Sequence, residues 1–283
     1  MINMRINNNI GALNAQKNVN NNNNAVANRL EKLSSGKRIN KAADDAAGLA
    51  ISEKIRTSIL GSMAASRNTQ DAISLIQVAE GGLQSMHGML QRARELAVQS
   101  ANGTNDDAVD RSAMQGEFAN IVAELDDTAN TTQFNGMNVL DGTGDPITIQ
   151  AGSNAGDTVD ISIDGMTAGE LLGFSGSSYD PATDVNLAAT SAAGEAIGTI
   201  DNAINDVSMQ RAELGAMQNR LEFRMQALDI QAENATAAGS RIRDTDMAKM
   251  MSELTAKNIL QKASTAMLAQ ANARPQNIVG MLG

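Results

Sequence analysis

The chain has 283 residues, with 32 acidic and 22 basic side chains and a net charge of −10. Aromatic residues make up 2% of the chain and there is no tryptophan. Large globular cores depend on aromatic side chains for buried area, so the composition favours narrow helix seams over a large globular core. The absence of cysteine excludes disulfides, thiol catalysis and thiolate metal sites. No apolar run is long enough to cross a bilayer, so the sequence also excludes a membrane-spanning helix.

Charge is distributed unevenly along the chain. Residues 1–67 carry ten basic against four acidic side chains, residues 241–283 carry six against three, and the middle carries six against twenty-five. Basic ends could serve as nucleic-acid-binding arms. The same ends are apolar and periodic, and their positive charges are dispersed, so we expect helix packing and no nucleic-acid binding.

The first forty residues combine helical apolar spacing with a run of asparagines, which have low helix propensity. Such a segment is expected to be helical against a partner and disordered when alone. Ser34 to Asp45 is typical of a connector, and a short helix is expected from Ala46 to Ser58, weakened at Gly61. Two apolar sets with steps of four and three mark the terminal helix: Ile6, Ile10 and Leu13, then Val26, Leu30 and Leu33.

A first long apolar seam runs from Ala72 to Ala97 with uninterrupted steps of four and three, the spacing of a coiled coil, and its helix is expected to continue to about Ala101. Asn102-Gly103 predicts its end. A second helix is expected from the capping residues 104–106 to about Asn130. The larger apolar members of the first seam are Ile76, Leu83, Met86 and Leu90, and those of the second helix are Met114, Phe118, Ile121, Leu125 and Thr128.

Residues 131–187 are rich in Gly, Asp, Ser and Thr, and alternation at 147–149 and 159–163 predicts two strands joined by a turn. The longest seam follows from Ala193 to Ala235 and is expected to end near Gly239. A last helix is expected over 241–273, ended by Pro275. The larger members of the long seam are Ile200, Ile204, Val207, Leu214, Leu221 and Leu228; those of the last helix and tail are Leu260, Met267 and Leu282.

These patterns predict a mainly α fold. It comprises a long antiparallel helical coiled-coil rod with a small β-hairpin region, and a terminal-helix coiled-coil domain formed by the two chain ends. Because isolated short helices are marginal in water, the terminal helices must bury their apolar faces on each other or on neighbours. A protein whose terminal helices are not stable by themselves is expected to assemble with other molecules.

Several longer motifs resemble bacterial flagellin, and they occur in family order at both ends of the chain. The N-terminal motifs are MRINNNIGALNAQ at 4–16, LEKLSSGKRINKAADDAAGLAISEKIR at 30–56, QRARELAVQSANGT at 91–104 and TQFNGMNVLDG at 132–142. The C-terminal motifs are LGAMQNRLEF at 214–223, NATAAGSRIRDTDMAKMM at 234–251 and ILQKASTAMLAQANARPQNIVGMLG at 259–283.

The resemblance implies a domain organisation. Residues 1–45 and 241–283 would form the inner domain of the filament core, residues 46–142 and 188–240 would form the rod domain, and 143–187 would be a short β and loop insertion of that rod. The outer variable domains of the family would be absent or minimal.

The resemblance also implies a function and partners. The chain would be a secreted structural subunit that polymerises with itself into the flagellar filament used for swimming, with no catalytic activity, no cofactor and no metal. Its partners would be an export chaperone on the 241–283 helix, hook-associated junction and cap proteins, and the Toll-like receptor of vertebrate hosts. The alternatives are a hook–filament junction protein and a secreted coiled-coil adhesin, which would explain the seams without the paired terminal motifs.

No catalytic constellation is visible, and the single histidine, His87, is expected to be a helix surface residue. One set of residues matches the positions through which the receptor binds flagellin: Arg92, Leu96, Gln99 and Glu117. The simpler interpretation is that the charged members lie on an exposed face and that Leu96 packs beside the seam.

Overall fold

The computed structural model describes the backbone of residues 8–106, 109–144, 146–173 and 185–282, and the side chains of these residues except 190 and 275–282. It contains two compact units. Unit 1 combines the two chain ends, Met1–Ser58 and Glu233–Gly283, and unit 2 is Ile59–Ala232. The predicted fold class is confirmed: the chain is mainly α, with long antiparallel helices, small β-hairpins and a pair of terminal helices.

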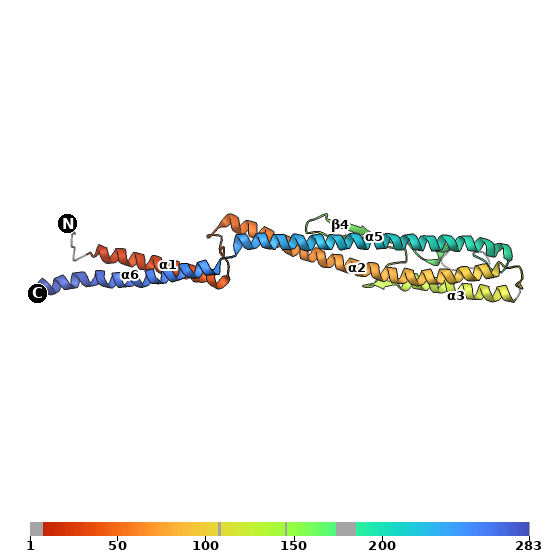
Figure 1. The fold of residues 1–283 in the computed structure, drawn as a ribbon, viewed down its shortest axis with the longest axis horizontal. Coiled ribbons are helices and arrows are strands. Elements are labelled where there is room, and N and C mark those ends of the chain that lie inside the picture. Colours follow the sequence, from red (N-terminus) through yellow and green to blue (C-terminus); the bar gives the residue numbers. More distant parts are fainter. Residues whose placement is uncertain (1–7, 107–108, 145, 174–184, 283) are drawn as a thin grey trace. The chain divides into compact units, whose positions relative to one another are not determined.

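Unit 1 is built on two long antiparallel helices, α1 (Ile10–Ser35) and α6 (Met247–Leu282), which lie side by side in Figure 1. Asn9 Nδ2 donates to the carbonyl oxygen of Ala271 (2.9 Å) near one end of the pair, and Arg29 pairs with Glu253 (3.2 Å) further along it. The residue numbers rise along α1 as they fall along α6, which fixes the antiparallel direction.

Both ends of α1 have a local cause. The side chain of Asn9 accepts a hydrogen bond from the backbone N–H of Ala12 (3.0 Å), which caps the first turn. Gly36 follows the helix with φ +68°, a left-handed conformation that glycine adopts without steric cost. After Gly36 the chain contacts the C-terminal part of unit 1, where the backbone N–H of Arg38 donates to the Arg243 carbonyl (2.7 Å).

Unit 2 contains most of α2 (Ala46–Ser100) and α5 (Thr190–Arg243), which are antiparallel. Three contacts between the helices establish this direction, because the residue numbers of the α5 partners fall as those on α2 rise. They are Ser66 with Asp229 (3.1 Å), Glu80 with Arg211 (3.6 Å) and Arg94 with Asp201 (2.6 Å).

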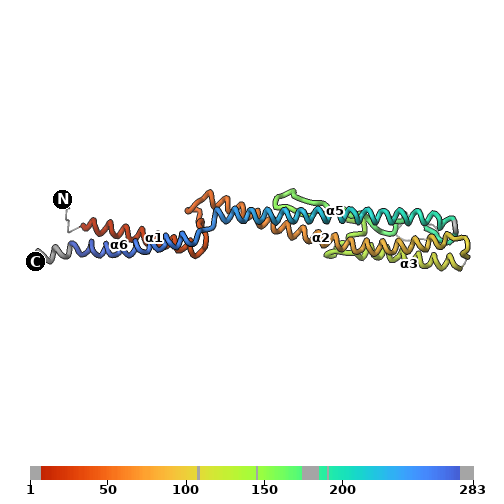
Figure 2. The backbone as a smooth tube through the Cα atoms, in the orientation of Figure 1, coloured from red at the N-terminus to blue at the C-terminus, as the bar shows by residue number. Residues whose placement is uncertain are grey.

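A third helix of unit 2, α3 (Asp110–Thr131), runs back along α2, as the tube in Figure 2 shows. Arg92 on α2 pairs with Glu117 on α3 (2.7 Å). At the turn between the helices, the buried Arg111 donates from Nε to the Ser100 carbonyl (2.8 Å) and from Nη2 to the Asn102 carbonyl (2.9 Å). This guanidinium supplies a hydrogen-bond donor to the Ser100 carbonyl, at the end of α2 where helix carbonyls lack an intrahelical partner, and ties it to the turn that follows.

Two short β-hairpins flank the helices of unit 2 in the described part of the chain. The predicted one, β3 (Ile147–Gln150) with β4 (Thr158–Ile161), is confirmed as antiparallel. The other, β1 (Gln133–Phe134) with β2 (Met137–Asn138), was not predicted. Its turn is Asn135-Gly136, with positive φ at both residues, the usual two-residue hairpin signal.

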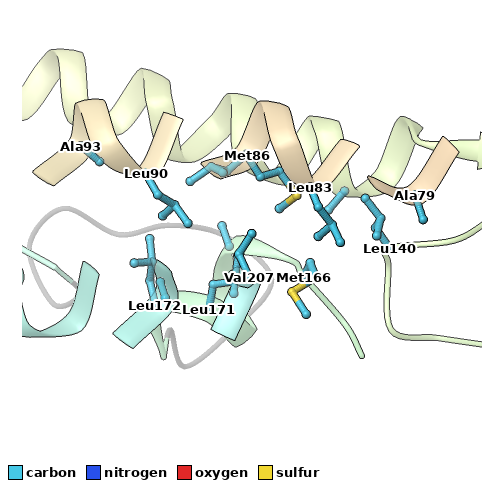
Figure 3. Packing of buried hydrophobic residues seen from close by; sticks show 14 of the residues in the cluster. Ala79, Leu83, Met86, Leu90, Ala93, Leu140, Met166, Leu171, Leu172 and Val207 are labelled. Atoms are coloured by element: carbon cyan, nitrogen blue, oxygen red, sulfur yellow. The ribbon is translucent and has the colours of Figure 1, made fainter. Parts of the chain in front are cut away.

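The core of unit 2 lies where α2, α3 and α5 meet the β segments and the short α4 (Ala168–Leu172). Figure 3 shows side chains of α2, α4, α5 and the segment between them directed toward one another. Of the predicted seam residues, Ile204 is partly buried and the rest are buried: Ile76, Leu83, Met86, Leu90, Ile200, Val207, Leu214, Leu221 and Leu228.

The phase predicted for α3 and part of α5 is wrong. On α3 the buried positions after Phe118 are Val122, Leu125 and Ala129; Leu125 was predicted, whereas Ile121 and Thr128 are only partly buried. On α5, Ala196 and Ala203 are buried, whereas their neighbours Ile197 and Ile204 are only partly buried. A helix that packs against more than one neighbour has a wider apolar face, so a single seam read from the sequence selects only one edge of it.

Three predicted helix ends are also wrong. The helix starting at Ala46 does not weaken at Gly61 but continues as α2 to Ser100. Likewise, α5 passes Gly239 and ends at Arg243, and α6 passes Pro275 and ends at Leu282. Around Gly61, tertiary packing outweighs the local cost of glycine in a helix. In α2, for example, Ser62, Ala65 and Thr69 are buried, and Thr69 Oγ1 donates to the Ala65 carbonyl (2.8 Å).

Candidate functional site: an assembly surface

Nothing in the described chain resembles a catalytic or metal site. No group of three or more His, Cys, Asp or Glu side chains in the described ranges is arranged to hold a metal ion. The ring Nε2 of His87 lies 3.0 Å from the amide of Gln91, one turn along the same helix. Within the same ranges, no helix combines the length and the apolar character needed to cross a bilayer.

The inward face of the terminal helix pair follows a heptad repeat that mixes apolar and polar positions. Beside the half-buried Ala25, Lys32, Glu253 and Asn258, a set of buried or half-buried positions steps by three and four, from Ala12 to Leu33 on α1 and from Met250 to Ala271 on α6. They are Ala12, Ala15, Val19, Asn22, Val26, Arg29 and Leu33 on α1, and Met250, Leu254, Lys257, Gln261, Ser264, Leu268 and Ala271 on α6.

The larger apolar side chains of these helices lie mostly on the outside. Ile10, Leu13 and Met267 are 57%, 66% and 64% exposed. Of the predicted filament-core residues, only Val26 and Leu33 lie on the inward face. Ile6 and the side chain of Leu282 lie outside the described residues. We call the following exposed set the outer apolar face of unit 1: Ile10, Leu13, Leu30, Met247, Met251, Ile259, Leu260 and Met267.

Such a face is costly for an isolated chain in water. Burying one side chain of this size stabilises a protein by about 1.5–3 kcal/mol relative to leaving it exposed. Contiguous exposed apolar surface is typical of an interaction site. The geometry of unit 1 is therefore that of a surface completed by another molecule.

Comparison with known proteins identifies the kind of assembly. Residues 6–145 match the family of the bacterial flagellin N-terminal helical region, and residues 197–282 match that of the bacterial flagellin C-terminal helical region. The chain is 48% identical to the flagellin of Bacillus subtilis (strain 168), over 99% of this chain and 100% of that protein. It is 45% identical to the flagellar filament 31.3 kDa core protein of Treponema maltophilum, with the same coverage.

The chain belongs to the bacterial flagellin family. It is a structural subunit of the extracellular flagellar filament and not an enzyme, as the resemblance predicted. A solved structure of a putative flagellar hook-associated protein from Vibrio parahaemolyticus aligns with a TM-score of 0.57, covering 71% of this chain and 100% of that chain. At 17% identity this likeness shows a shared fold only, so the junction-protein alternative is not favoured.

The residues matching the receptor-binding positions of flagellin do not form one surface. Arg92 is exposed and pairs with Glu95 (3.0 Å) as well as with Glu117 on α3. Its hydrogen bonds to Glu117 and then to Glu95 raise the pKa of the Arg92 guanidinium. Gln99 is exposed, whereas Leu96 is 1% exposed and belongs to the core of unit 2. In this conformation a partner can contact Arg92, Gln99 and Glu117 but not Leu96.

Proposed function

We propose that unit 1 is the filament-core element of this flagellin and that unit 2 is its rod domain. In this proposal the outer apolar face of unit 1 becomes buried between neighbouring copies when the chain polymerises. The observation that carries the proposal is the separation of faces on α1 and α6, with a small and partly polar inner face and large apolar side chains outside.

The terminal helices become ordered only if burial of apolar surface offsets their loss of conformational entropy. Ordering residues of a terminal helix costs about 1–2 kcal/mol per residue in backbone entropy, and the inner face buries fully only Val19 and Met250 among its inward positions. Contacts with neighbouring copies supply the missing burial. The terminal helices then gain most of their stability from the polymer and little from the free subunit.

Point variants of the outer face test this proposal in the full chain. Ile259→Ser with Met267→Ser removes two large apolar side chains from α6 without changing its inner face. Losing about 1.5–3 kcal/mol of burial per side chain should raise the critical concentration for seeded polymerisation by a hundredfold or more. A matched control, Thr255→Ser with Thr265→Ser, alters two exposed polar side chains of the same helix and should polymerise like the parent chain.

The measurement is sedimentation of polymer after seeding, with electron microscopy to identify filaments. If Ile259→Ser with Met267→Ser polymerises at the parent concentration, the outer face is not the assembly surface. Deletion of residues 1–40 or 245–283 should abolish polymerisation outright. A chain that forms long filaments by itself from seeds also differs from a junction protein, which does not.

We also propose that an export chaperone covers residues 241–283 before secretion, because the apolar side chains of α6 need cover in the unpolymerised chain. Deleting residues 241–283 should abolish chaperone binding in a pull-down with the purified chaperone. Hook-associated junction and cap proteins are proposed to contact the same terminal helices at the two ends of a filament, where the outer face has no neighbouring subunit.

A host Toll-like receptor is proposed to contact Arg92, Gln99 and Glu117, which are exposed. Arg92→Ala should weaken receptor signalling by the monomer without lowering the helical circular-dichroism signal. Arg94→Ala is a matched control, because it also removes an ion pair of α2, the one between Arg94 and Asp201 on α5 (2.6 Å). Equal signalling by the parent and Arg92→Ala would remove this proposal.

A further inference from the structure

The inner face of the terminal helix pair contains a polar layer near the middle of α1. Asn22 Nδ2 donates to Ser264 Oγ (2.6 Å), and Ser264 Oγ donates to the Leu260 carbonyl of its own helix (2.7 Å). Beside it, Gln261 Nε2 donates to Asn23 Oδ1 (2.7 Å). A second, longer bond joins Asn22 Nδ2 to the Leu260 carbonyl (3.4 Å).

The apolar part of the same face does not define how the two helices are aligned. Four positions of α1 spaced seven residues apart are Ala12, Val19, Val26 and Leu33. A slip of one heptad along α6, in either direction, brings another aliphatic side chain of this set to the places of Val19 and Val26. Apolar contacts of this kind therefore stabilise the slipped pairings almost as well as the observed one, since burial is non-directional.

The polar layer, by contrast, fits one alignment. After a slip of one heptad, Asn22 would be level with Lys257 or with Ala271 in place of Ser264. Ala271 has no side-chain acceptor, and the ammonium of Lys257 is only a donor, so the Asn22 N–H loses its side-chain acceptor in either case. The bond between Asn23 and Gln261 would be lost in the same movement, leaving half-buried polar groups unpaired.

We propose that the hydrogen-bonded layer of Asn22 and Asn23 with Gln261 and Ser264 sets the register in the middle of the two terminal helices. It adds to the contacts of Asn9 with Ala271 and of Arg29 with Glu253 on either side of it, and to the backbone bond of Arg38 with Arg243 beyond α1. A polar position in a coiled coil that is otherwise mostly apolar specifies register at a cost in stability, and this layer has that character. It deepens the proposed function, because correct register of this pair determines which outer side chains each subunit presents to its neighbours.

The register can be measured with one pair of spin labels. The chain has no cysteine, so Lys17→Cys on α1 and Lys249→Cys on α6 give two unique attachment points, both at exposed positions outside the inner face. A slip of seven residues moves one helix along the other by about 10 Å. Double electron–electron resonance on filaments diluted with unlabelled chain resolves that change in the inter-label distance.

The test variant is Asn22→Val with Ser264→Ala, which replaces the polar pair by apolar groups of similar size. Parent filaments should give one distance. Losing hydrogen bonds worth about a fivefold to tenfold preference should add a second population, displaced by about 10 Å, that holds a fifth or more of the label pairs. A single distance equal to that of the parent would overturn the proposal.

Two further variants separate the hydrogen bond from general disturbance. Asn24→Val with Thr265→Ala also replaces an amide and a hydroxyl side chain by apolar ones, at exposed positions beside the layer, and should keep one distance. Asn22→Ser with Ser264→Asn exchanges the partners and should also keep it. If the exchanged pair slips like Asn22→Val with Ser264→Ala, the hydrogen bond does not set the register.

Assembly itself is a separate readout. Failure of Asn22→Val with Ser264→Ala to form filaments, with the exchanged pair assembling normally, would support the proposal, because only the bonded pair then permits assembly. Failure of both, with the exposed control assembling, would overturn it. Failure of the parent chain to polymerise would instead refute the proposed function of unit 1, so the two failures are distinguishable.

Discussion

Adjacent glycines in the middle of α2 provide a prediction in which one physical effect can be isolated. Gly81 faces open space, and a Cβ placed on it would meet no atom within 4 Å. A Cβ on Gly82 would lie 2.7 Å from Leu140 Cδ1 and 3.0 Å from Thr132 Oγ1. Leu140 is fully buried, so it cannot move away without disturbing the core of unit 2.

Alanine at either position gains the same helix propensity, about 1 kcal/mol over glycine. Gly81→Ala should therefore stabilise unit 2 by about that amount. At Gly82 the gain is opposed by overpacking, which costs about 1–3 kcal/mol in a well-packed core. Because the propensity term cancels between the two variants, Gly82→Ala should be less stable than Gly81→Ala by about 1–3 kcal/mol.

Urea unfolding of the monomer, followed by circular dichroism at 222 nm, measures this difference with both variants at one protein concentration. For a unit of this size, 1 kcal/mol corresponds to about 2–4 °C in Tm, so thermal unfolding provides an independent check. The reasoning is refuted if Gly82→Ala is as stable as Gly81→Ala, because the loop containing Leu140 would then not approach α2 as closely as described.

Other predictions follow from single contacts. Phe118→Ala should destabilise unit 2 by about 3–5 kcal/mol in the same urea experiment, because Phe118 is fully buried on α3; a loss below 1 kcal/mol would contradict its place in the core. A double-mutant cycle of Arg94→Ala and Asp201→Ala should give a coupling of only about 0.2–1 kcal/mol, because both side chains are exposed. The hydrogen bond from Lys32 lowers the pKa of Asp44 to about 2, so its contribution to unit 1 is complete above its unfolded pKa of 3.8 and is lost as the pH falls toward 2. As the pH is lowered toward 2, filaments of Asp44→Asn should accordingly lose less helicity than parent filaments. An unchanged profile would contradict this role.

The inward residues of the helices were predicted better in unit 2 than in the terminal helices. Steps of four and three correctly predicted that residues around Leu83 and Val207 would be buried, because a coiled coil needs apolar side chains on a common side. In α1 the same rule selected Ile10 and Leu13, which share a spacing but lie outside the pair. Periodicity shows that side chains share a face, and it does not show which partner that face meets.

The candidate site was predictable in part. The sequence indicated that both ends carry apolar helices, and the family motifs indicated what they build. For Leu96 the sequence left two interpretations open, a receptor contact or a packing residue beside the seam, and its burial in the core of unit 2 agrees with the second. The hairpin at Asn135-Gly136 was missed although its turn signal was present, because its strands are only two residues each.

By itself the sequence determined that this protein is a mainly α flagellin with paired terminal segments and a small β region, because these properties depend on local spacing, turn residues and motifs. Only the tertiary structure decided which face of each helix is inward, that α2 continues through Gly61, and that polar as well as apolar side chains meet between the terminal helices. The physical reason is that burial depends on every neighbour a helix has. Several faces of one helix can satisfy the same periodicity, and packing with the rest of the chain selects among them.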